Sequence, residues 1–381
     1  EACKGHKAEQ QKFADFVASH TRTGRFYTPF AFVFGRFDGF RSFGKNSVWG
    51  NPRFYIDAPE LSWELLDMFY PLEKANGELY VHPCPADREI GMLSGTPRGN
   101  VDVIPIECSA KQMKKYRALA FLGYNKAVCD DFDKIEEFVE QGGTLIIGLP
   151  HMSVTSRRCD VVNLNSEYIK HGFAENFAYG FTFTEDTYCG NTVHVNKNVN
   201  PDGEVLAVTD GNLPLLIKYR LGNGTVYFVN AKEYPYSIQA PYRMAVEEVS
   251  NTLNESENVI IKCDERVQFA VYLQKDNSKH IYVTAVDWYR DPAEDRTAEL
   301  VFNKKAYPVK IPFGVTEKIV VNDNIAAWTD TDTSEVLSVS ENEITVQGCG
   351  EAMLYYICGG AMKEEKLFFG QNGKIIIGSL Q

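Results

Sequence analysis

The sequence lacks long apolar runs and paired cysteines. No stretch approaches the roughly 18 to 20 consecutive apolar residues that a transmembrane helix needs. The 381 residues contain nine cysteines but no CxxC pair, and an odd number leaves at least one thiol unpaired within the chain. We therefore expect no membrane span, no metal site, no cofactor and no dense disulfide framework.

Basic residues are in the minority. The chain has 39 lysines and arginines against 51 acidic residues, a formal net charge of -12. Binding to a phosphate backbone needs a basic face, so nucleic acid is not an expected partner. Repeats and low-complexity tracts are also absent, and a hydrophobic fraction of 44% is typical of a globular protein. No signal-peptide stretch is present, but a cleaved one leaves no trace. The compartment is therefore open between extracytoplasmic and cytoplasmic, with a lean to the former.

The first two thirds of the chain alternate between strand and helix patterns. Thr28–Gly35 is a continuous apolar run, as in a strand buried on both faces of a parallel sheet. Next, Tyr116–Gly123, Asp130–Gln141 and Gly143–Leu149 predict a strand, a helix and a strand. Because such crossovers join parallel strands, this part predicts an α/β domain.

The end of this sheet is predicted to be antiparallel. Leu215–Tyr219 and Thr225–Asn230 flank Gly222-Asn223-Gly224, and an Asn-Gly pair suits a tight hairpin. A last helix is expected at about Tyr242–Asn254.

After this helix the pattern changes to short alternating strands about ten residues apart, which is typical of a β-sandwich. The expected strands are Gln268–Leu273, His280–Ala285, Ala298–Phe302, Glu317–Val321, Glu335–Ser338, Glu343–Gln347 and Ala352–Ile357. Leu367–Phe369 and Lys374–Ile377 surround Gln371-Asn372-Gly373 and predict a final hairpin.

These patterns divide the chain into four parts. Residues 1–24 would be a helix (Ala8–Ser19) and linker from a preceding domain, and 25–255 the α/β domain. Residues 256–360 would be the β-sandwich, and 361–381 a C-terminal hairpin or tail.

The α/β part resembles the amidotransferase-like trimerisation domain that follows the catalytic barrel in beta-galactosidases of the barrel-bearing glycoside hydrolase clan. The resemblance covers about residues 20–255 by motif and the rest by domain order. The motifs, in order, are Tyr27-Thr28-Pro29-Phe30-Ala31, Trp49-Gly50, Tyr116-Arg117-Ala118-Leu119, Phe138-Val139-Glu140-Gln141-Gly142-Gly143-Thr144-Leu145, Gly222-Asn223-Gly224-Thr225-Val226-Tyr227-Phe228 and Tyr234-Pro235. It implies a flavodoxin or class I amidotransferase-like doubly wound sheet followed by an all-β sandwich.

The resemblance also implies where the chemistry lies. Such glycosidases carry their catalytic carboxylate pair on the barrel, which would precede residue 1. A barrel needs about 250 residues, and only about 25 precede the first strand here. The chain is therefore expected to be a fragment or processed half with an accessory role. Its expected partners are carbohydrate and a catalytic barrel or parent polypeptide, and a homo-oligomer is an open alternative.

A working class I amidotransferase would have a cysteine in the turn after the strand Thr144–Gly148. Leu149 and Pro150 stand there, and neither can act as a nucleophile. We therefore expect no catalytic residue in this chain. His151 is interpreted as a loop or helix-start residue rather than a base, and Cys129 as an ordinary buried side chain.

Two clusters remain as carbohydrate-binding candidates. Arg36, Asp38 and Trp49 follow the first strand, and ligands bind doubly wound sheets at the carboxyl ends of strands. Asp38 could equally pair with an arginine while Trp49 packs, and the structural interpretation is favoured.

The second cluster is Asp287, Trp288 and Tyr289 at a strand end of the sandwich. Aromatic rings stack on sugar faces while carboxylates accept from hydroxyls, although most such aromatic pairs only cover a core. Pairing Glu233 with Asp287 as glycosidase acids is a remote possibility, because they lie in different predicted domains. The alternatives left open are a free-standing carbohydrate-binding protein and an enzyme with a site near Asp38.

Overall fold

The structure is a computed structural model. It describes residues 7, 10, 11, 14, 23–35, 69, 74–75, 78–79, 96–122, 129–152, 172–235, 238–255, 259–263, 267–285, 295–312, 316–331 and 333–378. All structural statements below concern these residues.

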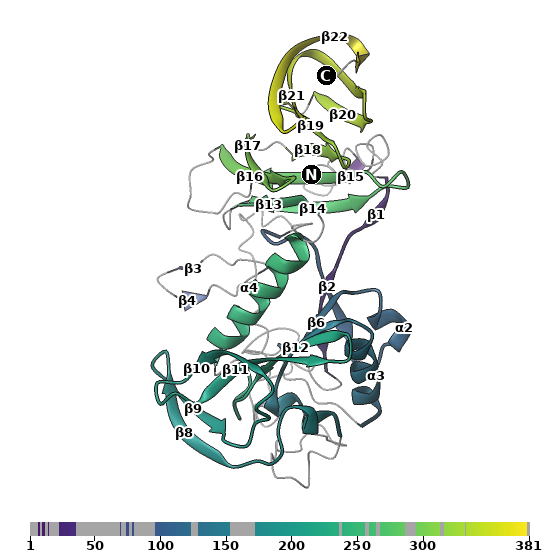
Figure 1. The fold of residues 1–381 in the computed structure, drawn as a ribbon. Coiled ribbons are helices and arrows are strands. Elements are labelled where there is room, and N and C mark those ends of the chain that lie inside the picture. Colours follow the sequence, from purple (N-terminus) through teal and green to yellow (C-terminus); the bar gives the residue numbers. More distant parts are fainter. Residues whose placement is uncertain are drawn as a thin grey trace. The chain divides into compact units, whose positions relative to one another are not determined.

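The chain forms two compact units (Figure 1). The first consists of Glu1–Tyr27, Ala270–Val283 and Val315–Gln381, and the second of Thr28–Phe269 and Thr284–Gly314. The four sequence-based divisions stay predictions, and the helix expected at Ala8–Ser19 lies largely outside the described residues.

The second unit is built on a seven-stranded sheet, in the order β10-β11-β12-β7-β6-β2-β5. The strands from β12 to β5 are parallel to their neighbours, whereas β10, β11 and β12 pair antiparallel. The predicted crossover and hairpin are therefore confirmed. The strands span Glu204–Val208 (β10), Pro214–Leu221 (β11), Gly224–Val229 (β12), Thr144–Gly148 (β7), Ala118–Ala120 (β6), Phe30–Phe34 (β2) and Val101–Pro105 (β5).

Helices cover both faces of this sheet. Side chains of adjacent strand residues point to opposite faces, so the two faces form two hydrophobic clusters. Leu119 and Leu145 belong to the cluster that contains the buried face of α3 (Cys129–Glu140). Ala118 and Ile146 belong to the other, which contains α4 (Ala240–Glu255). Figure 1 shows the two helices on either side of β6 and β12.

The α3 helix packs on the sheet through one stripe of its surface. Ile135, Phe138 and Val139 are all buried in the same cluster. The helix ends before Gly142, whose φ of 109° lies in the left-handed region that glycine tolerates.

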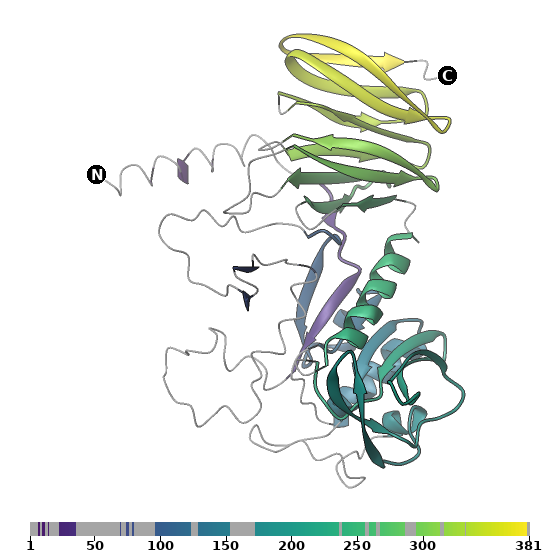
Figure 2. The same ribbon diagram turned by 90° about the vertical axis from the view of Figure 1, so that its left-hand side faces the viewer.

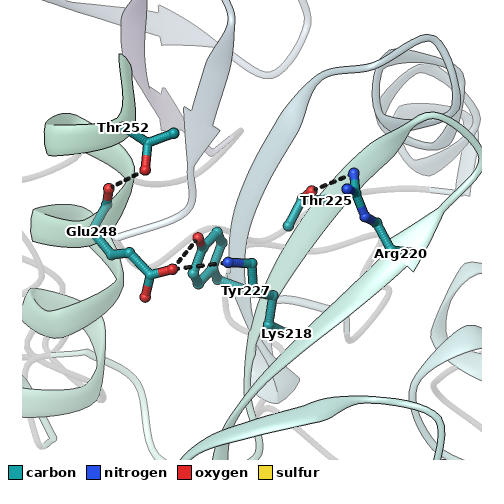
Figure 3. Close-up of polar contacts among 6 residues, drawn as sticks. All are labelled: Lys218, Arg220, Thr225, Tyr227, Glu248 and Thr252. Carbon is teal, nitrogen blue, oxygen red and sulfur yellow. Dashed lines mark hydrogen bonds and ion pairs between the residues drawn. The ribbon is translucent and has the colours of Figure 1, made fainter. Parts of the chain in front are cut away.

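A polar contact ties α4 to the sheet (Figure 3). Glu248 Oε1 accepts hydrogen bonds from Lys218 Nζ at 2.9 Å and from Tyr227 Oη at 2.8 Å. Burial raises the pKa of Glu248, but the hydrogen bonds from Lys218 and Tyr227 outweigh it, so the net shift is downward. One carboxylate thus connects the helix to the neighbouring strands β11 and β12.

Glu248→Ala is expected to lower the free energy of unfolding by about 1 to 2 kcal/mol, since two hydrogen bonds to a partly exposed charged group are lost. Urea unfolding measures this loss. The matched control is Glu247→Ala, which removes an exposed carboxylate paired with Arg98 and is expected to cost about 0.5 kcal/mol or less. Equal losses in the two variants would show that the Glu248 contact adds nothing.

The strands after α4 lie in two further sheets, which is compatible with the expected sandwich part. Eight strands form the sheet β1-β14-β15-β18-β19-β21-β20, with β22 paired to β21. They span Arg25–Phe26 (β1), Val267–Leu273 (β14), Lys279–Ala285 (β15), Thr316–Val321 (β18), Ile325–Thr329 (β19), Ser334–Val339 (β20), Glu343–Cys358 (β21) and Ala361–Gly378 (β22). A separate sheet contains Val259–Lys262 (β13), Arg296–Phe302 (β16) and Lys305–Ile311 (β17).

The final hairpin expected from the sequence is wrong. Leu367–Phe369 and Lys374–Ile377 belong to one strand, β22, which pairs with β21 along its length. The chain reverses instead at Gly359 and Gly360, which both have positive φ. A shift in register between Gly348 and Gly350 of β21 accommodates the extra residues of β22. Figure 2 shows β21 and β22 as two long adjacent strands at the C-terminal end.

Candidate functional site

The carbohydrate-binding candidates lie outside the described residues. The structure describes β2 and Gly35 but not the residues that follow, and it describes β15 only to Ala285. Their roles stay predictions. The six residues are Arg36, Asp38, Trp49, Asp287, Trp288 and Tyr289.

The turn after β7 is described, and it has no nucleophile. Leu149–Met152 form one 3₁₀ turn in which all four side chains are buried. Leu149 is a member of the α3 cluster. The position where an amidotransferase-like enzyme would present a reactive thiol is therefore occupied by packed apolar side chains.

His151 holds this turn together. Its Nδ1 accepts a hydrogen bond from the backbone N–H of Gly148 at 2.9 Å. Its ring packs against Phe121, Tyr234 and Tyr242, with centroid separations of 5.8, 5.4 and 6.1 Å. The residue lies in a turn, as expected, and its contacts are those of a buried structural side chain.

Tyr242 of α4 contacts the ring of His151. The residue is fully buried, and its hydroxyl has no hydrogen-bond partner among the described residues. Burial raises its pKa well above the ordinary value. A Cβ on Gly148 would lie only 1.8 Å from this hydroxyl, so the turn has no room for any other residue at that position.

A second polar group lies just beyond β12. Glu233 accepts from His194 twice, through Oε2 from the backbone N–H at 3.0 Å and through Oε1 with the ring Nδ1 at 2.5 Å. His194 belongs to a two-stranded hairpin formed by Phe183–Tyr188 (β8) and Asn191–Asn196 (β9). A bridge between Val195 and Ala231 joins this hairpin to the segment after β12.

The ring of His194 is flanked by two carboxylates. Its Nε2 lies 3.7 Å from Oε2 of Glu185, whose side chain is 73% exposed. A carboxylate that holds one ring nitrogen of a histidine fixes its orientation and leaves the other nitrogen able to exchange a proton. His194 and Glu233 therefore have the geometry of an acid–base pair. Among the described residues, no hydroxyl or thiol is hydrogen-bonded to the His194 ring.

The sequence does not predict this group. It offers Glu233 only as a partner for Asp287, and it gives no signal for His194, because nothing in a short alternating strand marks one histidine as paired. The described residues contain no cluster of three or more His, Cys, Asp or Glu side chains able to hold a metal ion. No helix of the described chain is long and apolar enough to cross a bilayer.

Comparison with known proteins gives structural similarity at low identity. No protein-family model and no curated protein sequence matches the chain. Among solved structures, beta-galactosidase from Bacillus circulans sp. alkalophilus is 16% identical with a TM-score of 0.44, and 78% of this chain aligns with 42% of that enzyme. Beta-galactosidase from Halorubrum lacusprofundi is 16% identical with a TM-score of 0.43, covering 80% and 41% respectively. The chain thus spans about two fifths of the length of these beta-galactosidases.

Proposed function

We propose that this chain is an accessory, non-catalytic part of a beta-galactosidase-like glycoside hydrolase, with an amidotransferase-like doubly wound sheet as its core. The observation that carries the proposal is the turn after β7. Leu149 and Pro150 are buried there, and the nearby His151 is engaged in holding the turn. Covalent catalysis needs an accessible nucleophile beside a base, and this turn offers none.

The layered arrangement supports the fold part of the proposal. A sheet with a parallel centre and helices on both faces is the architecture of doubly wound folds. The substrate class comes from the resemblance of the sequence motifs, several of which lie on β2, β7 and β12. In this account the carboxylate pair that cleaves the glycoside is supplied by a barrel elsewhere in the parent polypeptide or by a separate chain.

The experiment is a turnover assay of the purified chain. It is expected to release neither ammonia from glutamine nor aryl alcohol from a panel of aryl glycosides at rates above a heat-denatured control. Glutamine hydrolysis by the chain would contradict the interpretation of the turn after β7, and glycoside hydrolysis would contradict the accessory role.

A further inference from the structure

The β22 strand has one edge that no described strand covers. This strand pairs with β21 and with no other described strand, so its second edge presents a row of backbone N–H and C=O groups. Native proteins usually shorten, cover or interrupt such edges, because they form a template for another strand. β22 is 18 residues long, so the edge that no described strand pairs with is long.

Two large apolar side chains lie near the start of β22 on the face away from the core. Met362 is 37% exposed and Phe368 is 63% exposed. The intervening residues on the same face, Glu364 and Lys366, are exposed as well. Side chains of a strand alternate between faces, so these four form one line with the order apolar, acidic, basic, apolar.

The opposite face of this segment is already occupied. Leu367 and Phe369 are buried in the cluster formed by β19, β20 and β21. The line from Met362 to Phe368 is therefore held in place by packing on the other side of the strand. Its ends are marked by Gly360 in the turn and by Gly370 near the register shift.

We propose that a second copy of this chain pairs with the edge of β22, antiparallel and around a twofold axis at Glu365. This arrangement places Met362 opposite Phe368 of the second copy and Glu364 opposite Lys366 of the second copy. Because the axis repeats each contact, two apolar pairs and two opposite-charge pairs form from one line of four residues. Cross-strand pairs of both kinds stabilise antiparallel sheets.

The apolar pairs set the register. Moving the axis by one residue to Glu364 forms two Lys363–Glu365 pairs but separates Met362 from Phe368, and moving it to Lys366 removes both the apolar and the opposite-charge pairs. In the proposed register Glu365 lies opposite Glu365 of the second copy, a like-charge pair that opposes association, and Lys363 of the second copy lies diagonal to it, within reach of a long side chain. The ladder runs from Ala361 to Phe369, and each copy supplies the same segment, as a twofold interface requires.

Existing contacts within one copy are compatible with this pairing. Lys366 Nζ lies 2.7 Å from Glu351 Oε2 and 5.0 Å from the ring centroid of Phe368. Both contacts lie at the surface, since the side chains of Lys366 and Glu351 are 53% and 62% exposed. They orient Lys366 along the line of exposed residues that the second copy would meet.

Sedimentation equilibrium of the full chain over a concentration series tests the proposal. The wild-type chain is expected to reach twice the chain mass. Glu364→Lys and Lys366→Glu, each measured alone, are expected to remain at the chain mass, because like charges then face each other at both pairs. An equimolar mixture of the two variants is expected to recover the doubled mass, because each Lys then faces a Glu.

Phe368→Ser changes no charge and is expected to weaken association about tenfold. Thermal melting of each variant checks that the fold is kept. If either charge reversal unfolds the chain, Phe368→Ser still tests the interface. A wild-type chain that stays monomeric, charge variants that associate like the wild type, or a mixture that stays monomeric would each overturn the proposal. The readout is mass, so it is independent of the glycoside hydrolase proposal.

Discussion

Gly148→Ala is expected to destabilise the chain by about 3 kcal/mol or more, enough to unfold a marginally stable domain. The added methyl group would lie 1.8 Å from Oη and 2.9 Å from Cζ of Tyr242. Tyr242 cannot move aside easily, because it is fully buried between α4 and the sheet and contacts the ring of His151. Urea unfolding followed by circular dichroism measures the loss.

The matched control is Gly172→Ala. Among the described residues, no atom outside its chain neighbours lies within 4 Å of a Cβ added at Gly172, so this variant is expected to stay within about 0.5 kcal/mol of the wild type. Tyr242→Phe removes a buried hydroxyl that has no hydrogen-bond partner among the described residues, and it is expected to be neutral or stabilising. If Gly148→Ala and Gly172→Ala unfold at the same urea concentration, the turn is looser than described.

The second large effect is a loss of stability in acid that depends on His280. Burial and, to a smaller extent, the charge of Lys318 lower the pKa of His280, while Asp276 and Glu335 oppose the shift, and the net pKa is about 4. The residue is 8% exposed, and its Nδ1 has no hydrogen-bond partner among the described residues. The folded chain therefore keeps this ring neutral.

The sign follows from proton binding. An unfolded histidine titrates near pH 6.5, so between pH 6.5 and 4 the unfolded chain binds a proton that the folded chain does not. Stability attributable to His280 is full above pH 6.5 and falls by up to about 3 kcal/mol as the pH approaches 4. Guanidinium unfolding at several pH values measures the slope.

His280→Leu is the variant that isolates this effect. It cannot titrate and its side chain is of comparable bulk, while all other carboxylates and histidines remain. Its stability is expected to fall less steeply than that of the wild type between pH 6.5 and 4. Parallel curves for the two proteins would mean that His280 is solvated in the folded chain.

Local patterns predicted most of the parallel sheet because each element there satisfies several rules at once. The α3 helix has an apolar stripe at helical spacing and a glycine stop, and β2 is apolar throughout because both of its faces are covered. The turn between β11 and β12 is Gly222-Asn223, and the glycine at its first position supplies the positive φ that a tight hairpin needs. Such signals depend on neighbouring residues, so the sequence alone reveals them.

The misses have physical causes that act over longer distances. In β19 all five residues are buried, so no alternation marks it as a strand. Pro308 lowers the strand signal of β17, which tolerates proline because it is an edge strand. Gln371-Asn372-Gly373 has turn chemistry, yet pairing with β21 extends the chain through it. The contact between His194 and Glu233 joins residues 39 apart, which no local pattern reports.

The proposed function predicts that this chain has no catalytic residues of its own. Its most direct test compares aryl glycoside turnover by the wild-type chain with turnover by Glu233→Gln, which alters the described histidine–carboxylate pair while keeping its shape. We predict that both proteins are folded and that neither turns over substrate above a denatured control. Turnover by the wild type that disappears in folded Glu233→Gln would contradict the account and locate an active site at His194.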